Sequence, residues 1–337
     1  MISFVIPAYN ASAYLDRAIN SIVADGNNND KFEIIIVENG STDNTTEIAE
    51  KFVQLYSNIH LFHSEKGVSN ARNYGIKHAK GEWIFFVDAD DYLTAEALAV
   101  LLKDAETKKY DLFLYGHEAG TTPKVVTDQI QGEVYHDGDV KRIRIAMLEN
   151  PTKYMQVWAK LFKRELIMEN EILFDDCLRL SEDSDFTLQY SRVCKNIFVS
   201  PSITYHYSID NVSTMRGSNG DKTKDYVFAM ERTLERIKNE DKCILQAFQK
   251  YILMHLNIAL VRDVFEASNI ASFKEKKAQM KDIANEAVFA NAISEVKVRE
   301  SLSLRMIPIL CLKYHLYVIS GLVYALRAYM NKRRENQ

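Results

Sequence analysis

Three carboxylates end an apolar run near residue 88. The run Phe85–Val87 leads directly into Asp88, Asp90 and Asp91. Carboxylates this close repel one another unless a divalent cation or a metal-bound diphosphate neutralises them. The same pattern could be a simple turn before a helix cap at Thr94. We interpret it as a Mn²⁺ or Mg²⁺ site at the end of a strand, with Asp90 as a metal ligand.

Two earlier apolar runs also end in polar residues. Residues 5–10 read VIPAYN, and residues 37–43 read VENGSTD. A dinucleotide-binding loop would need G-x-G-x-x-G at the first turn, and neither this pattern nor a Walker lysine is present. The amides and carboxylates instead suit hydrogen bonds to a nucleobase edge and to ribose hydroxyls. In residues 67–75, Arg72 lies on a predicted helix whose N-terminus can face phosphate.

The elements that must position these residues alternate between strands and helices. Over residues 1–115, short apolar runs alternate with stretches of helical periodicity, which predicts a parallel sheet covered by helices. The carboxyl ends of such strands are where open α/β sheets hold ligands. The predicted strands are Phe4–Ile6, Phe32–Val37, Ile59–Phe62, Trp83–Val87 and Asp111–Tyr115, and the predicted helices are Tyr14–Val23, Thr45–Tyr56, Ser69–Ala79 and Ala95–Ala105.

The second half of the chain differs in pattern. Residues 116–210 mix short strands with helices, and from residue 222 onward the sequence is nearly all helical. With 337 residues, 47% of them hydrophobic, the chain can bury an α/β core and a second helical unit. The predicted helices here are Arg142–Leu148, Lys163–Glu169, Tyr226–Ile237, Ile244–Ala267 and Phe273–Ala292, followed by an amphipathic tail.

Composition narrows the class of protein further. The four cysteines lie far apart without C-x-x-C spacing, so neither a zinc knuckle nor a disulfide framework is indicated, and a reducing cytoplasm fits. The first residues lack the basic and apolar regions of a secretory signal. The net charge is −4, and we expect no nucleic-acid partner.

Taken in order, the motifs resemble glycosyltransferase family 2, the nucleotide-sugar transferases of the GT-A fold. The matching segments are VIPAYN at 5–10, VENGSTD at 37–43, GVSNARNYG at 67–75 and DADD at 88–91. The resemblance implies an α/β Rossmann-like sheet with a helical C-terminal extension. It also implies that the donor is bound by Pro7, Ala8, Tyr9, Glu38, Asn39, Asp43, Arg72, Asp88, Ala89 and Asp90.

One position departs from the pattern of the family. Asn39 stands where relatives often have an aspartate. An amide oxygen can still accept a hydrogen bond from a uracil N–H, but it lacks the charge, so UDP is less firmly indicated as the donor nucleotide.

Residues 180–186, LSEDSDF, resemble the acidic motif that places the general base in this family. An inverting transfer needs a carboxylate to remove the proton of the acceptor hydroxyl. We predict that Asp183 does so, with Glu182 as the alternative. Adjacent acids at a helix start could instead serve the helix dipole.

Several further residues are candidates for the acceptor and the metal. Trp158, Lys160 and Asp91 are predicted acceptor contacts, although Trp158 could equally be a core residue. His206, between two tyrosines on a predicted strand, could complete the metal shell or simply be a packed polar residue. Arg216, in a polar loop, could close over the diphosphate.

The end of the chain is basic and apolar at once. Residues 297–337 carry eight Lys or Arg and two Glu, an excess of six positive charges. Lys313, Ser320 and Arg327 recur every seven residues and predict a polar stripe on one apolar helix. The uncharged interval is shorter than the ~20 residues that span a bilayer, so an interfacial anchor is favoured. The alternatives are packing on its own domain or a seam between copies.

These inferences predict an inverting glycosyltransferase that moves a monosaccharide from a nucleotide-diphosphate sugar, with UDP favoured, to a saccharide acceptor. We expect a lipid-linked acceptor in cell-surface polysaccharide synthesis, and a cytoplasmic protein bound peripherally to the inner face of the membrane. The alternatives are a non-catalytic nucleotide-sugar or membrane-surface binding protein, and a nucleotidyltransferase. The expected domains are 1–215, divided into a nucleotide-sugar half (1–115) and an acceptor half (116–215), and a helical region, 222–337, whose tail is 301–337.

Overall fold

A computed structural model divides the chain into two compact units. It describes residues 1–23, 30–120, 124–126, 132–209, 222–266, 268–297 and 304–335. The first unit comprises Met1–Cys177 and Glu182–Gly217, and the second comprises Leu178–Ser181 and Ser218–Gln337. The chain therefore enters the second unit for four residues before it returns to the first.

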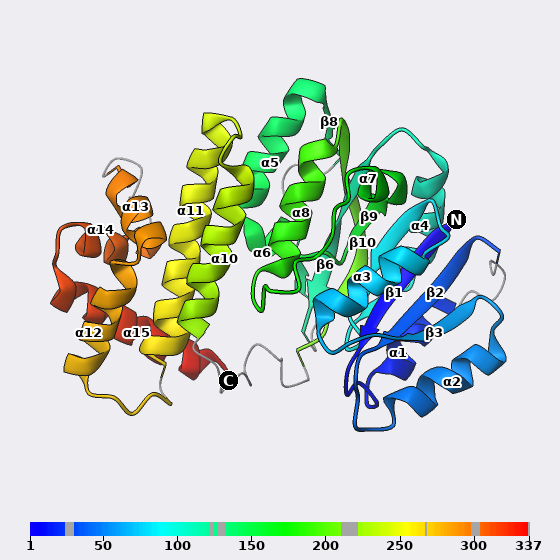
Figure 1. Cartoon of the computed structure of the whole chain (residues 1–337), viewed down its shortest axis with the longest axis horizontal. Coiled ribbons are helices and arrows are strands. Elements are labelled where there is room, and N and C mark those ends of the chain that lie inside the picture. The colour runs from blue at the N-terminus through cyan, green and yellow to red at the C-terminus, as the bar shows by residue number, and fades with distance from the viewer. Residues whose placement is uncertain are drawn as a thin grey trace. The chain divides into compact units, whose positions relative to one another are not determined.

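A mixed sheet forms the centre of the first unit (Figure 1). Among the described residues, the strand order is β3-β2-β1-β4-β9-β6-β10-β5, with β7 beside β6 and β8 beside β10. Strands β1 to β4 pair in parallel, whereas β9 is antiparallel to both of its neighbours. The strands are β1 (Ile2–Ala8), β2 (Phe32–Glu38), β3 (Ile59–His63), β4 (Trp83–Phe86), β5 (Tyr92–Leu93), β6 (Leu112–Ala119), β7 (Lys124–Val126), β8 (Val134–His136), β9 (Lys160–Lys163) and β10 (Asn196–Tyr207).

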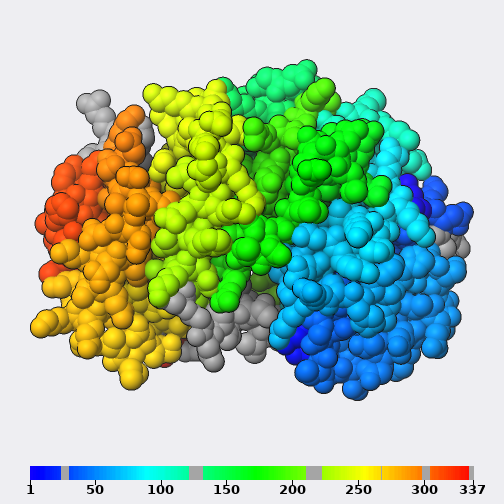
Figure 2. Space-filling model, in the orientation of Figure 1, coloured from blue at the N-terminus to red at the C-terminus, as the bar shows by residue number. Residues whose placement is uncertain are grey.

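Helices cover both faces of this sheet. On one face, apolar side chains of α1, α2 and α4 share a buried cluster with alternate residues of the first strands, such as Phe4 and Ile34. On the other face, α3 lies against β1 and β2, and its residues form part of the surface over these strands in Figure 2. The helices are α1 (Leu15–Val23), α2 (Thr45–Leu55), α3 (Val68–His78), α4 (Ala97–Glu106), α5 (Val140–Glu149), α6 (Pro151–Tyr154), α7 (Arg164–Glu169) and α8 (Glu182–Val193), with a 3-10 turn, η1, at Asp137–Asp139.

Gly75 explains how α3 approaches the sheet so closely. A Cβ atom at this position would lie 2.3 Å from Val5 Cγ1, well inside any van der Waals contact. Further along the same face, Phe86 meets Phe162, Phe174 and Phe186, and the last two rings stack with centroids 4.1 Å apart. This aromatic cluster fixes α8 against the strands.

The second unit is helical in its described residues. Two of its helices have clear sequence signals for their starts: Asp241 caps α11, and Ser272 with Glu275 forms a capping box on α12. Its helices are α10 (Lys222–Ile237), α11 (Lys242–Ala259), which continues as the π-helical turn η2 (Leu260–Val264), α12 (Phe273–Ala284), α13 (Ala287–Glu295), the 3-10 turn η4 (Leu304–Met306), α14 (Ile307–Lys313) and α15 (Tyr317–Glu335).

The first four strands lie within two residues of their predicted positions, but two predicted helices were wrong in extent. The helix expected over Phe273–Ala292 is divided into α12 and α13, and the single tail helix is divided into α14 and α15. The second break follows from His315, which has a φ of 58° and cannot continue a right-handed helix.

One stretch of the second unit has the length and composition of a membrane span. It is Lys242–Val264, with a mean hydropathy of 1.2, and 56% of it is buried within the protein. A buried core helix passes the same test, and α11 packs against α10 and α13.

Candidate active site

The ends of β1 and β2 are held together by their own polar residues. Ala8 pairs with Glu38, and the Asn39 amide donates to the Ala8 carbonyl at 3.1 Å. Burial opposes ionisation of Glu38, but hydrogen bonds from Ser41, His63 and Gly40 outweigh it and lower its pKa. The Glu38 carboxylate therefore shapes the loop that follows it.

Asp43 has a similar role in the same loop. Its two oxygens accept from the main-chain amides of Ser12 at 3.0 Å and Thr45 at 3.1 Å. Burial raises its pKa slightly, but these bonds and the Thr45 hydroxyl lower it to about 2. Asp43 thus connects the loop after β1 to the start of α2 through hydrogen bonds.

Asn39 differs from these carboxylates. Its side chain is buried, and its Oδ1 atom has no hydrogen-bond partner among the described residues. Nearby, Pro7 and Ala8 are buried in β1, whereas the exposed Tyr9 accepts a hydrogen bond from Lys66 at 2.8 Å. A buried, unsatisfied amide oxygen beside an exposed aromatic ring is suited to receive the edge of a planar ligand.

Arg72 of α3 joins two of the acidic motifs. Its guanidinium bonds Asp88 Oδ1 at 3.0 Å and Asp183 Oδ1 at 2.6 Å, and lies 3.6 Å from Glu182 Oε1. The side chain is only 3% exposed and lies over the ring of Phe174. Burial opposes its charge, but Asp183, Asp88 and Glu182 raise its pKa above the ordinary value, so Arg72 remains a cation.

Asp88, Asp90 and Asp91 lie together at the end of β4. Their carboxylate oxygens are within 4.8 Å of one another. Asp91 is 1% exposed and accepts from the Tyr205 hydroxyl at 2.8 Å and the Ser208 amide at 2.8 Å. Burial, followed by the charges of Asp88 and Asp90, raises its pKa to about 8. The expected acceptor contact from Asp91 therefore does not fit its position, because both of its oxygens are already used inside the protein.

This group fits a hard divalent cation. Its donors are carboxylate oxygens, which Mg²⁺ and Mn²⁺ prefer, and a cation would relieve the repulsion that raises the pKa of Asp91. Asp88 and Asp90 are half-buried and are the members able to reach a ligand, with Ala89 buried between them. His206 is not brought to this group: its Nδ1 atom pairs with Glu118 Oε1 at 2.9 Å, and its ring stacks on Tyr92.

The two acids at the start of α8 ionise differently. Burial and the charge of Asp183 raise the pKa of Glu182 to about 8. Burial also raises the pKa of Asp183, but the cation of Arg72, followed by smaller contributions that include Lys160, opposes the rise. Arg72 lies closer to Asp183, at 2.6 Å, than to Glu182, at 3.6 Å, and so favours the ionised form of Asp183 over that of Glu182.

Trp158 and Lys160 are more deeply buried than a contact with the acceptor would require. Trp158 stacks on Tyr205 with ring centroids 4.6 Å apart and belongs to the buried cluster of the sheet, in agreement with the core alternative. Lys160 is 1% exposed, and burial lowers its pKa to about 7 against the opposing effect of Asp183. Lys160 therefore acts on Asp183 electrostatically, while Arg216 lies outside the described residues.

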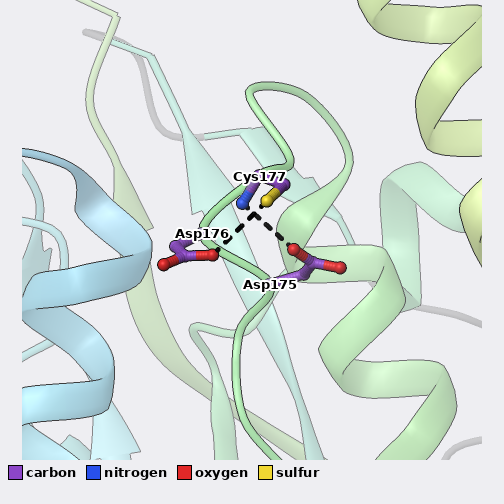
Figure 3. A group of neighbouring side chains, drawn as sticks. All are labelled: Asp175, Asp176 and Cys177. Atoms are coloured by element: carbon purple, nitrogen blue, oxygen red, sulfur yellow. Dashed lines mark hydrogen bonds between the residues drawn. The ribbon is translucent and has the colours of Figure 1, made fainter.

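A second acidic group lies near the end of the first unit (Figure 3). In it, the Cys177 amide donates to Asp175 at 3.0 Å, and the Cys177 thiol lies 3.6 Å from Asp176. The charge of Asp175, followed by the bond to Asp176, raises the pKa of the thiol. Asp176 and Cys177 are exposed, and exposed acidic groups commonly occur without a metal ion, so we assign no site here.

Three residues of the site were missed by the sequence analysis. Arg17 donates to the Asp90 carbonyl at 2.6 Å and to the Ser208 hydroxyl at 3.0 Å. The hydroxyl of Tyr205 accepts from the Asp88 amide and donates to Asp91, and Phe174 underlies Arg72. No local motif in the sequence marks these residues.

Comparison with known proteins agrees with this geometry. Residues 3–169 match the sequence profile of the family described as Glycosyl transferase family 2. The chain is 30% identical over 243 residues to a poly(ribitol-phosphate) beta-glucosyltransferase of Bacillus spizizenii, covering 71% of this chain but only 37% of that enzyme. It is 24% identical to a Bacillus subtilis protein named EpsH, over 94% of this chain and 92% of EpsH.

Among solved structures, Staphylococcus aureus TarS 1-349 in complex with UDP-GlcNAc has the same fold. The TM-score is 0.70 at 20% identity, over 99% of this chain and 92% of that one. The sheet, the ordered motifs and the profile match together define the GT-A class. Residues 3–169 of the chain form a domain of glycosyltransferase family 2.

Proposed function

We propose that this protein is an inverting glycosyltransferase that moves a monosaccharide from a UDP-sugar to a saccharide acceptor. The observation that carries the proposal is the position of Arg72, a buried cation that holds Asp88 and Asp183 on either side of it. A cation between a strand-end carboxylate and a second carboxylate suits a site where a diphosphate leaves and a hydroxyl attacks.

In this proposal, Asp183 is the general base. Its ionised carboxylate removes the proton of the acceptor hydroxyl while that oxygen bonds to the anomeric carbon and the bond to the diphosphate breaks. Arg72 lies closer to Asp183 than to Glu182, whose pKa burial raises to about 8, and this supports Asp183 as the acceptor of that proton. A divalent cation bound by Asp88 and Asp90 would neutralise charge on the departing diphosphate.

The choice of UDP rests on Asn39. Its buried Oδ1 atom lacks a partner, and the N–H of a uracil edge would supply one. The donor complex of TarS is in line with this choice. Sugars of the relatives include both glucose and N-acetylglucosamine, so either a hexosyl or an N-acetylhexosaminyl group is consistent with the family.

The acceptor is proposed to be a growing cell-surface polymer, and a lipid-linked one if synthesis begins on a membrane carrier. Support comes from relatives named for transfer to poly(ribitol-phosphate). The chain spans 37% and 41% of the length of the two relatives so named, so the acceptor is proposed for this chain and not transferred from them.

The test is donor turnover over a panel of UDP-, GDP- and CDP-sugars with Mn²⁺ or Mg²⁺, comparing the wild-type protein with Asp183→Asn. Transfer should fall by roughly 10²- to 10⁴-fold in the variant while UDP-sugar affinity is retained. Tight donor binding without turnover by the wild-type protein would favour the non-catalytic alternative. If Asn39→Ala weakened UDP, GDP and CDP equally, the uracil contact would be wrong.

A further inference from the structure

Helix α15 exposes its apolar side chains and buries its small and polar ones. The exposed residues are spaced at helical intervals and form one stripe, which we call the outer face. Leu322 and Leu326, at its centre, are 56% and 58% exposed. An apolar stripe of this length is uncommon on a free surface and marks a contact with something else. The outer face consists of Val318, Ile319, Leu322, Leu326, Tyr329 and Met330.

The opposite side of α15 accounts for its packing within the second unit. Ser320, Gly321, Tyr324 and Ala328 are buried there. A Cβ atom on Gly321 would lie 3.1 Å from the ring of Phe273 in α12, so the helices approach closely through this glycine. The contact of α15 with the core of the second unit is made through this opposite side. The outer face is therefore not needed for packing within the unit.

The predicted polar stripe points into the unit. The Lys313 ammonium donates to the carbonyls of Ser294 and Val296 at 2.8 and 2.6 Å, and the Ser320 hydroxyl donates to Pro308 at 3.0 Å. Arg327 donates to the carbonyl of Leu304. The carbonyls of Ser294 and Val296 lie at the C-terminal end of α13, where helix carbonyls have no partner within the helix. The polar groups of this stripe are therefore bonded within the second unit.

Other cations flank the outer face. Arg305 lies in η4 near one end, and Lys332 and Arg333 follow the outer face at the other, all three exposed. No Asp or Glu occurs in the sequence from residue 304 to residue 334. The rest of the chain, residues 1–296, carries the opposite charge, since −4 overall less +6 for residues 297–337 leaves −10. Positive charge is thus concentrated where apolar side chains are exposed.

From these observations we infer that the outer face of α15 docks on an anionic lipid bilayer. Exposed leucines with tyrosine among them suit the boundary between head groups and acyl chains, and the flanking cations suit anionic head groups. A second copy of this protein is a less suitable partner for the outer face. A two-fold contact through this stripe would bring basic segments together with no acidic residue of the same segment to pair with them.

The helix lies on the membrane and does not cross it. Residues 314–326, between Lys313 and Arg327, are uncharged, and this interval is shorter than the ~20 residues of a bilayer span. One side of α15 is also committed to α12 and α14. Docking in the plane of the bilayer buries the outer face and leaves this packing intact.

The experiment is flotation of the full chain with vesicles of phosphatidylcholine containing 30% phosphatidylglycerol, or of phosphatidylcholine alone. The wild-type protein should float with the anionic vesicles. Leu322→Glu/Leu326→Glu should weaken partition at least about 100-fold, because two buried leucines are lost. Lys332→Glu/Arg333→Glu should weaken binding to anionic vesicles by roughly 25-fold or more and change binding to neutral vesicles little.

Ile270→Glu is the matched control, since Ile270 is a fully exposed apolar residue of the same unit outside the outer face. It should float like the wild-type protein. The inference is overturned if the wild-type protein does not float, or if Leu322→Glu/Leu326→Glu floats equally well. Light scattering without vesicles gives a further check: a wild-type dimer that this variant disperses would make the face a seam between copies.

If circular dichroism shows that Leu322→Glu/Leu326→Glu does not fold, Lys332→Glu/Arg333→Glu still tests the inference. Undiminished binding of that variant to anionic vesicles would contradict membrane docking. Flotation uses neither donor nor acceptor. Failure of membrane docking and failure of the proposed sugar transfer are therefore observed separately.

Discussion

Asp90 and Asp91 are neighbours in sequence with opposite surroundings. Asp91 is buried and accepts hydrogen bonds from Tyr205 and Ser208, whereas the main-chain carbonyl of Asp90, which any residue would retain, is what Arg17 binds. We expect Asp91→Ala to destabilise the protein by about 2 kcal/mol or more, because buried donors lose their acceptor. Asp90→Ala should leave stability unchanged or slightly raised, since it removes repulsion.

Thermal unfolding with and without Mn²⁺ and UDP distinguishes the two residues. The midpoint of Asp91→Ala should fall by several degrees, whereas that of Asp90→Ala should hold in the absence of metal but lose the increase that metal gives the wild-type protein. Metal-dependent turnover should disappear in Asp90→Ala. A well-folded Asp90→Ala protein with normal activity would remove the metal assignment.

Lys160 offers a test of pH dependence. Its cation stabilises the ionised form of Asp183 and so opposes the rise in pKa that burial causes. Lys160→Met removes that effect, the pKa of Asp183 rises, and the carboxylate needed as base forms only at higher pH. The acid limb of the pH–rate profile should therefore move to higher pH.

Lys163→Met is the control for this shift. Lys163 lies on the same strand, β9, but pairs with Glu165 and is not among the charges that act on Asp183. Its profile should match that of the wild-type protein. A profile unchanged in Lys160→Met would mean that Asp183 does not control the acid limb.

At the scale of single residues, the sequence predicted which residues belong to the site better than it predicted the contacts between them. Asp88, Arg72 and Asp183 were all expected in the site, but their contact joins residues up to 111 positions apart, and no local pattern encodes such a distance. For a related reason, the sequence alone did not decide whether Asp91 and Trp158 contact the acceptor or lie in the core, where the structure buries both. Whether a polar or aromatic side chain faces a ligand or the core depends on what Tyr205 and its strand place opposite it.

Among the helices and strands, the close packing of α3 against β1 depends on Gly75. Gly75→Ala would place a methyl group against Val5, a stiff β-branched residue that is fully buried. We expect a loss of about 1–2 kcal/mol in the free energy of unfolding, although alanine favours a helix by ~1 kcal/mol over glycine. Urea unfolding measures the change.

Gly138→Ala is a suitable control, because nothing lies within 4 Å of a Cβ atom there. Combining Gly75→Ala with Val5→Ala should recover part of the loss, since the clashing methyl groups are removed. Gly75→Ala as stable as the wild-type protein would show that α3 can shift. Because α3 carries Arg72, such a shift should then appear as weakened donor binding.

Elements were predicted well where periodicity alone decides them, as in β1 to β4. In the C-terminal tail, periodicity alone did not determine the helices. A seven-residue recurrence of Lys313, Ser320 and Arg327 predicted a polar stripe on one helix, but the turn at His315 separates the first residue from the others. Lys313 is directed into the unit by the carbonyls of Ser294 and Val296 at the end of α13, which a helical projection of the tail does not include.

For the whole molecule, residues 178–181 belong to the second unit and directly precede α8 of the first unit in the sequence. Ser181, at a φ of 64°, directly precedes α8, and its hydroxyl lies 3.3 Å from His255 Nε2. His255 Nδ1 faces the Tyr251 carbonyl and must donate to it, so Nε2 accepts from Ser181. Burial lowers the pKa of His255 to about 4, which keeps this arrangement neutral.

We expect His255→Phe to lower transfer roughly five- to tenfold with donor affinity unchanged, because the start of α8 loses a buried hydrogen bond while ring volume is kept. Asp183 would be present but less well placed. Steady-state kinetics and calorimetry with UDP separate the two quantities. Equal losses in both would indicate general unfolding of the second unit instead.

The same hydrogen bond has a consequence for synthesis on the ribosome. His255 follows Ser181 by 74 residues, so at 5–20 residues per second about 4–15 s pass before the residue that fixes the start of α8 has been made. The sheet and its strand ends can form during this interval. The hydrogen bond between Ser181 and His255 can form only after His255 has been made, so a nascent or truncated chain should bind donor before it reaches full transfer activity.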